Sequence, residues 1–238
     1  MPDLNFEIIA TEVPPFAVVP TLVFKLRIAS TPPTNAIQSI ALRIQIQIAV
    51  NHRRYSAEEQ ARLLELFGEP QRWRETLRPL LWTHASTVIP QFSESIVADL
   101  PVSCTYDFEV ATTKYFDALK DGKIPLHFLF SGTIFYKNEE GHVQVAQIPW
   151  SKEAFYRLPV ATWKMMIARY YPNSAWLCLQ KDVFDQLYHY KATHSLPTWE
   201  AAVTQLLQRS EPSAHPPLNS TESVASLPGE AAYGGEFS

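Results

Sequence analysis

The chain has 238 residues, 46% of them hydrophobic, and a formal net charge of −4. A chain of this length buries roughly 70% of its unfolded surface, so it can fold without disulfides or metal ions. The acidic balance argues against a nucleic-acid-binding protein, because such proteins concentrate basic residues on one face. The two cysteines, Cys104 and Cys178, are too few for a disulfide framework and indicate buried thiols in a reducing compartment.

The first residues and the hydropathy bear on localisation. Acidic residues begin at Asp3, and no basic segment followed by an apolar one leads to a cleavage site, so we expect no secretory signal. No apolar run reaches the length of about 18 residues that a membrane span requires. These features predict a cytoplasmic globular protein.

The first strands are predicted from alternating hydrophobicity. Residues 22–28 carry Leu, Phe, Leu and Ile at their even positions, and residues 40–50 carry Ile, Leu or Val at theirs. Period two is typical of a strand with one buried and one more polar face. Pro32 and Pro33 lie between the two segments and cannot continue a ladder, so we predict two antiparallel neighbours.

Residues 51–123 mix helical and strand-like patterns. Ser56 and Glu59 form a capping box, which predicts a helix that ends near Gly68, and Pro70 predicts a further short helix. Strands are predicted at 87–89 and 104–110, and a helix at 113–119. The adjacent pair Arg53 and Arg54 indicates a solvated loop.

A hairpin is predicted over residues 126–148. Residues 126–136 form a long strand with Gly132 at its centre, and a glycine there indicates a bulge or a close backbone approach. Residues 138–141 then turn the chain into a second strand at 143–148.

The remaining ordered part is predicted to be helical. Pro159 suits the first turn of a helix that Pro172 ends, and an extended piece follows at 175–179. Asp182 and Thr198 are the predicted caps of two further helices. Residues 210–238 are rich in Ser, Pro, Glu, Gly and Ala, which predicts a disordered tail. We therefore expect an α+β protein with a single domain over residues 1–209.

The sequence shows no pattern typical of a catalytic or metal site. The seven histidines are scattered, and neither Cys-x-x-Cys nor His-Glu-x-x-His occurs. A Gly-x-Ser-x-Gly elbow is missing, and seven glycines are too few for phosphate-cradling loops. We expect no enzyme, no cofactor and no metal. The alternative is an enzyme with its site around His84, Cys104 and Asp107.

Taken in order, these segments resemble the SecB-type export chaperones, which have a four-stranded antiparallel sheet followed by helices. Residues 5–8 and 13–17 are similar to their first strand and its phenylalanine–proline segment, and residues 131–135 to their glycine-containing third strand. Similarity continues at Leu158–Pro159, at Tyr171–Pro172 and over 184–190.

The resemblance covers residues 5–50 and 124–194. It implies a SecB-like antiparallel sheet followed by C-terminal helices. On this reading, residues 51–123 are a mixed helix and strand insertion between the second and third strands.

The chain is also similar to a mainly actinobacterial family loosely associated with nickel–iron hydrogenase gene clusters, which implies a hydrogenase-related client. SecB-type proteins present acidic residues on the sheet face that docks the translocase motor. The corresponding positions here are basic or neutral: Lys25, Arg27, Arg43, Gln45 and Gln47. A dedicated client chaperone therefore fits the resemblance better than coupling to that motor.

A polypeptide-binding surface needs exposed apolar and aromatic side chains. The candidates are Phe16, Phe135, Trp163, Met165 and Met166. Trp163 and Met166 share a helical stripe that a plain core would also produce, whereas Met165 lies off that stripe. An unpaired edge strand is a template for a second subunit, so we expect a homo-oligomer.

Three hypotheses for the function follow. The leading one is a non-catalytic polypeptide-binding protein, either a SecB-like chaperone or a dedicated assembly factor for a client enzyme. The second is a stable structural accessory subunit of a partner complex, which would not bind unrelated unfolded proteins. The third is the enzyme with a site in residues 51–123.

Overall fold

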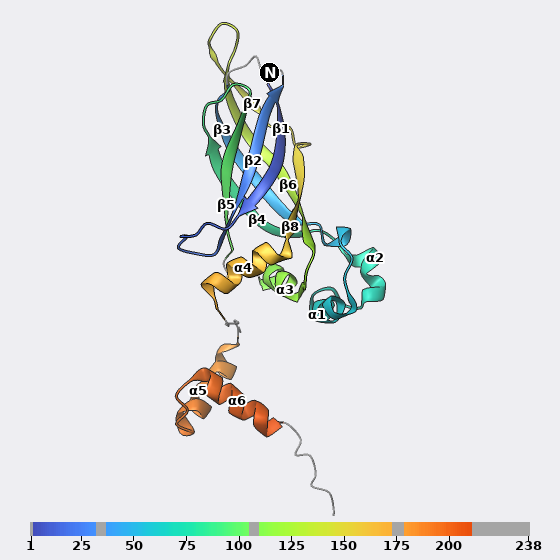
Figure 1. Cartoon of the computed structure of the whole chain (residues 1–238), viewed down its shortest axis with the longest axis vertical. Coiled ribbons are helices and arrows are strands. Elements are labelled where there is room, and N and C mark those ends of the chain that lie inside the picture. The colour runs from blue at the N-terminus through green and yellow to red at the C-terminus, as the bar shows by residue number, and fades with distance from the viewer. Residues whose placement is uncertain (1, 32–36, 105–109, 173–178, 211–238) are drawn as a thin grey trace, which may run out of the picture. The chain divides into compact units, whose positions relative to one another are not determined.

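The computed structural model describes residues 2–31, 37–104, 110–172 and 179–210. The chain forms two compact units, Met1–Trp176 and Leu177–Ser238, and each is described here by itself. Their boundary falls inside the span 1–209 that the sequence assigns to one domain. The first unit contains antiparallel sheets and helices, and the second contains helices, which confirms the α+β class (Figure 1).

Two antiparallel sheets form the body of the first unit. Sheet A has the order β1-β2-β5, with β1 at Asp3–Glu12, β2 at Thr21–Thr31 and β5 at Ser95–Ser103. Sheet B has the order β4-β3-β6-β7, with β3 at Ile37–Ile48, β4 at Leu80–Ile89, β6 at Lys123–Lys137 and β7 at Val143–Gln147. Strand β8, at Glu153–Pro159, also pairs β6. Residues 51–123 thus contribute one strand to each sheet.

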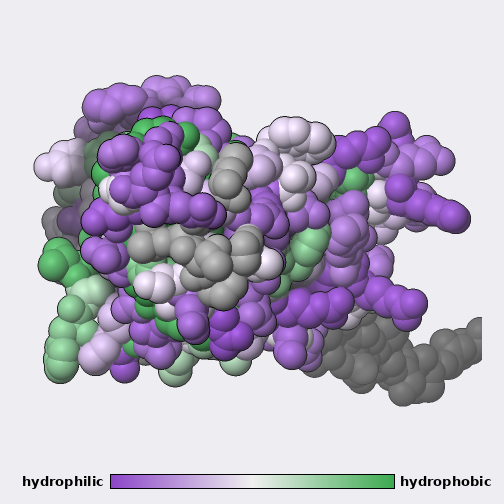
Figure 2. Space-filling model, turned by 90° about the horizontal axis from the view of Figure 1, so that it is seen from above, coloured by the Kyte–Doolittle hydropathy of each residue, from purple (hydrophilic) through white to green (hydrophobic). Residues whose placement is uncertain are grey.

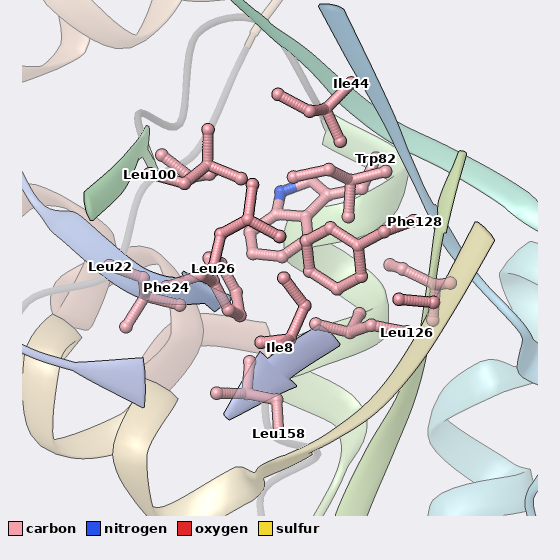
Figure 3. Close-up of a cluster of buried hydrophobic side chains, with 14 of the residues drawn as sticks. Ile8, Leu22, Phe24, Leu26, Ile44, Trp82, Leu100, Leu126, Phe128 and Leu158 are labelled. Carbon is pink, nitrogen blue, oxygen red and sulfur yellow. The ribbon is translucent and has the colours of Figure 1, made fainter. Parts of the chain in front are cut away.

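The sheets face each other across a hydrophobic core. Phe6 of sheet A stacks on Phe130 of sheet B with ring centroids 4.3 Å apart, and Phe24 meets Phe128 edge to face at 5.2 Å. Figure 3 shows side chains of both sheets converging on this core. Full burial of one such side chain stabilises the fold by about 1.5–3 kcal/mol.

The alternating pattern predicts the buried faces correctly but not the strand partners. In β3 the even positions from Ile40 to Ile48 are buried. The prediction that β2 and β3 are antiparallel neighbours is wrong, because β2 lies between β1 and β5 while β3 lies between β4 and β6. Each strand already uses both of its edges, and alternation carries no information about which partner fills them.

The predicted hairpin is confirmed as β6 and β7. Gly132 has φ +138, and a Cβ atom added to it would lie 2.1 Å from the carbonyl oxygen of Ala41 on β3. The glycine therefore marks a close backbone approach, as predicted. The register shows β8 pairing β6 over Lys123–Leu129 and β7 pairing it over Thr133–Lys137. The two short strands share one edge of β6 in tandem.

Helices close one end of the sandwich (Figure 1). They are α1 at Ala57–Phe67, α2 at Trp73–Thr76, α3 at Val110–Ala118 and α4 at Val160–Tyr170, with short 3-10 turns η1 at Val50–His52 and η2 at Pro70–Arg72. Phe116 of α3 lies 4.2 Å from Trp163 of α4 and 5.2 Å from Trp82 of β4, measured between ring centroids. This aromatic cluster joins the helices to the sandwich.

Several local predictions for these helices can be checked. The capping box is confirmed: the amide of Glu59 donates to Ser56 Oγ and the amide of Ser56 to Glu59 Oε2. Gly68 caps α1 with φ +68. The predicted strand 104–110 is wrong at its end, because α3 begins at Val110; residues 105–109 lie outside the described residues.

The second unit contains α5 at Lys181–Thr193 and α6 at Trp199–Ser210. Thr198 caps α6 as predicted, since its Oγ1 accepts from the amide of Ala201. The prediction for Asp182 is wrong: the N-cap of α5 is Gln180, and Asp182 lies in the first turn. The extended piece 175–179, except for Leu179, and the predicted tail 210–238, except for Ser210, lie outside the described residues.

Candidate functional site

The edge of sheet B formed by β7 is the candidate site. Strand β7 ends the sheet, and among the residues that the structure describes it pairs with β6 alone. The other edge of β7 therefore has no described strand beside it. A row of unpaired backbone groups of this kind is a template for an added strand.

The register identifies which backbone groups face outward. The amide of Ile148 donates to the carbonyl of Gly132, and the amide of Asn138 donates to the carbonyl of His142. Hydrogen-bonded pairs alternate with non-hydrogen-bonded pairs along an antiparallel ladder. Between these two bonds, the β7 residues that are hydrogen-bonded to β6 are therefore Gln144 and Ala146. The amides and carbonyls of Val143, Val145 and Gln147 consequently point away from β6.

Apolar side chains accompany these backbone groups. Val143 and Val145 are 60% and 59% exposed. Phe135 lies directly opposite Val145 in the non-hydrogen-bonded register, where facing side chains approach most closely, and it is half-buried. Trp150 is exposed in the connection from β7 to β8, and Phe155 of β8 stacks on His127 at 4.3 Å. The edge therefore combines free backbone groups with an adaptable apolar surface.

The other predicted binding residues fall into two groups. Phe16, in the connection between β1 and β2, is 97% exposed, and Met165 of α4 is 57% exposed. Trp163 and Met166 are buried in the helical end of the sandwich and offer no surface to a partner. The apolar stripe of α4 thus belongs to the hydrophobic core, and its helical spacing is also typical of a core helix.

The second unit carries a separate apolar surface that the sequence did not single out. Phe184, Tyr188 and Trp199 are exposed, and both other rings lie within 6.1 Å of the ring of Trp199. Within the described part of α5 and α6, Ala202 is the one residue classed as buried.

Hydrophobic residues are scattered on the end of the sandwich that carries the N-terminus. Figure 2 looks down on this end and shows a mostly hydrophilic face, with hydrophobic residues in small separate patches.

The pair Arg53 and Glu59 departs from expectation. The sequence indicates a solvated loop at Arg53, but its side chain is only 8% exposed and lies 2.6 Å from Glu59 Oε1. Burial alone would raise the pKa of Glu59, but the amides of Lys120 and Ser56 and the guanidinium of Arg53 outweigh it, so that pKa is lowered. The pair stays ionised and pins the start of α1 to the segment before β6.

Two phenols beside this ion pair form a structural hydrogen-bond chain. Tyr55 donates to the carbonyl of Val50 at 2.6 Å, so the hydroxyl of Tyr115, 3.0 Å away, donates to Tyr55. Burial raises the pKa of Tyr55 to about 12 and also raises that of Tyr115. Both phenols are protonated at neutral pH and cannot act as bases.

The alternative enzyme site is not assembled by the described residues. His84 is exposed on β4, whereas Cys104 is buried and its thiol donates to the carbonyl of Val102. Asp107 lies outside the described residues. In the part of the chain that the structure covers, no group of three or more His, Cys, Asp or Glu side chains is placed to hold a metal ion.

The described helices also bear on membrane insertion. None of them combines the length and the apolar character needed to cross a bilayer.

These features define a β-sandwich closed by helices, in which β7 forms one edge of sheet B. The chain belongs to a family of unknown function (DUF6084), whose model matches residues 1–215. No curated protein matches the chain.

Three solved structures show weak likeness. One is a protein described as late embryogenesis abundant (LEA), 16% identical over 67% of this chain and 73% of that one, with a TM-score of 0.31. The β-glucosidase of Kluyveromyces marxianus and β-glucosidase 3B of Thermotoga neapolitana are 10% and 11% identical, with TM-scores of 0.22 and 0.20. Each match covers 66% of this chain but 15% and 17% of the respective glucosidase. At such low scores these likenesses support no conclusion about activity or ligand.

Proposed function

We propose that this protein is a non-catalytic polypeptide-binding protein, a SecB-like chaperone or a dedicated assembly factor, and that it binds an extended client segment at the edge of β7. The observation that carries the proposal is the outward row of backbone groups at Val143, Val145 and Gln147. A client in extended conformation adds a strand there and completes the sheet.

The chemistry of such an edge suits several client sequences. Main-chain hydrogen bonds supply affinity without reading the client's side chains, while alternate side chains contact the surface beside the edge. Val143, Val145 and Phe135 provide that surface. Because these contacts are apolar and non-directional, they favour hydrophobic segments over charged ones.

Other features support the same role. The resemblance to SecB-type chaperones concerns the order of segments and implies binding of unfolded polypeptides. Phe16 and Met165 remain candidate contacts because both are exposed, whereas Trp163 and Met166 do not, because both are buried. We propose a hydrogenase-related client on the resemblance to the actinobacterial family, and homo-oligomers on the open edge, which a second copy can also fill.

The first experiment measures suppression of aggregation of an unrelated unfolding protein, with the oligomeric mass recorded in parallel. A general holdase suppresses aggregation at near-stoichiometric amounts. If the chain does not suppress it, the general chaperone is excluded. A client that co-purifies from the native cell at fixed stoichiometry would then support the accessory subunit.

The decisive variant is Val145→Pro. Proline removes the outward amide of residue 145, which bonds nothing on β6, and edge strands tolerate proline at such positions. We expect the melting temperature to stay close to that of the wild type while client binding is lost. Val145→Thr keeps the amide and the shape, so it should retain most of the binding.

Gln144→Pro tests the register on which this design rests. The amide of Gln144 faces β6, so its loss removes a ladder bond and should lower the melting temperature more than Val145→Pro does. Unchanged client binding by a folded Val145→Pro protein would exclude the β7 edge as the binding site.

A further inference from the structure

A pocket of basic side chains lies at the corner where the segment after η1 meets β6 and β8. Its volume is about 370 Å³, and it is lined by His52, Arg53, Arg54, Lys123, Pro125 and Arg157. No carboxylate is among these lining residues. The chain as a whole carries a net charge of −4, so this gathering of cations runs against the average composition.

Backbone pairing brings these residues together from three parts of the sequence. The amide of Ala49 donates to the carbonyl of Pro125 at 2.9 Å, which ties the start of η1 to β6. Arg157 lies directly opposite Pro125 in the ladder between β8 and β6, and Lys123 begins β6. The arrangement therefore follows from the sheet register and not from the chance position of one mobile loop.

Arg53 forms a fixed wall of the pocket. Its guanidinium donates to Glu59 at 2.6 Å and to the backbone carbonyls of Lys123 at 2.9 Å and Asp121 at 2.8 Å. Its Nε atom is buried and has no hydrogen-bond partner among the described residues. Glu59 neutralises the charge of Arg53, so the uncompensated charge of the pocket belongs to the other cations.

Those other cations contrast with the two cations of sheet A, Lys25 and Arg27. On sheet A, Lys25 lies within 3.1 Å of both Glu12 and Asp99, and Arg27 lies 3.0 Å from Glu7. Within the part of the chain that the structure describes, Arg54, Lys123 and Arg157 form no ion pair with a carboxylate. Like charges held near one another destabilise the fold unless a counter-charge binds between them.

We propose that this pocket binds the phosphate group of a small molecule. Guanidinium groups donate paired hydrogen bonds that match phosphate oxygens, and a lysine adds a compact positive charge. Arg54 and Arg157 supply the first kind of contact and Lys123 the second. The pocket is separate from the β7 edge, and the proposal is independent of client binding.

Thermal shift and calorimetry on the full chain test the site. Inorganic phosphate and ribose 5-phosphate are the probes, each compared with chloride at the same ionic strength, because a general salt effect acts equally through any anion. We expect phosphate to raise the melting temperature above the chloride value. Tighter binding of ribose 5-phosphate would assign the site to a phosphorylated metabolite, and equal binding would assign it to free phosphate.

Two matched substitutions locate the effect. Arg157→Gln removes one charged donor from the pocket and should weaken phosphate binding by about tenfold or more. Arg43→Gln makes the same charge change on the exposed face of β3, opposite Ser131 and eight residues along β6 from Lys123. It should leave the affinity within about twofold, because distant surface charges are screened. Equal effects of phosphate and chloride, or unweakened binding by a folded Arg157→Gln protein, would overturn the proposal.

Discussion

Replacing Gly132 by alanine tests whether the close approach of β6 to β3 is required by the fold. Gly132 adopts φ +138, a backbone conformation that side chains with L configuration rarely adopt. The new Cβ atom would lie 2.1 Å from the carbonyl oxygen of Ala41 and 3.1 Å from its carbonyl carbon. Both atoms belong to the backbone of a central strand, so a simple rotamer change cannot relieve the contact.

The expected cost has two parts. The unfavourable backbone conformation costs about 1–3 kcal/mol. Forcing atoms into a well-packed region costs about 1–3 kcal/mol more. We therefore expect the free energy of unfolding to fall by about 2–6 kcal/mol, which corresponds to a melting temperature lower by about 4–24 °C for a domain of this size.

Denaturant unfolding measures this loss, and Gly141→Ala is the matched control. Gly141 also has a positive φ, +82, but a Cβ atom there meets nothing within 4 Å. The control should therefore cost only the conformational part, about 1–2 kcal/mol. Equal losses of stability in the two variants would refute the argument that the Ala41 carbonyl requires glycine at residue 132.

Two further predictions concern the buried ion pair and α4. The folded state lowers the pKa of Glu59 below its ordinary value of 4.5. The ionised carboxylate therefore contributes fully to the free energy of unfolding above pH 4.5, and this contribution is lost as the pH falls through the folded pKa. Glu59→Gln should cost up to about 3 kcal/mol at pH 7. When urea unfolding is measured at several pH values, the stability of the Glu59→Gln protein should also decline less steeply below pH 4.5 than that of the wild type. Met166→Ala should cost about 2–5 kcal/mol because Met166 is fully buried. Met165→Ala should change stability by less than about 0.5 kcal/mol, and the reverse order would mean that α4 is rotated.

The elements that could be predicted from sequence are those with a local signal. The alternation of β3, the hairpin of β6 and β7, and the capping box of α1 each depend on residues a few positions apart. The sequence does not predict β8, because Pro159 ends this strand and also precedes α4, and a proline there is typical of a helix start. Strand β5 was missed because Pro101 weakens its pattern; its pairing with β2 keeps it in the sheet.

The candidate sites could be predicted only in part, because topology assembles them. The hairpin pattern predicts β7, but nothing in its residues says that β7 ends the sheet. The basic pocket joins residues from 52 to 157, and the one local signal, Arg53 beside Arg54, indicates a solvated loop. Burial of Arg53 depends on Glu59 and on the backbone carbonyls of Asp121 and Lys123, which only the folded chain brings to it.

The length of β7 limits what the proposed edge can bind. The strand has five residues, and the connection through Trp150 separates it from β8. Natural sheets use short edge strands to avoid open-ended pairing between molecules. An incoming segment can therefore form a ladder only about as long as β7, with alternate side chains over Val143 and Val145. Such an edge favours brief, exchangeable contacts with short apolar segments, which a chaperone needs and a permanently bound accessory subunit does not.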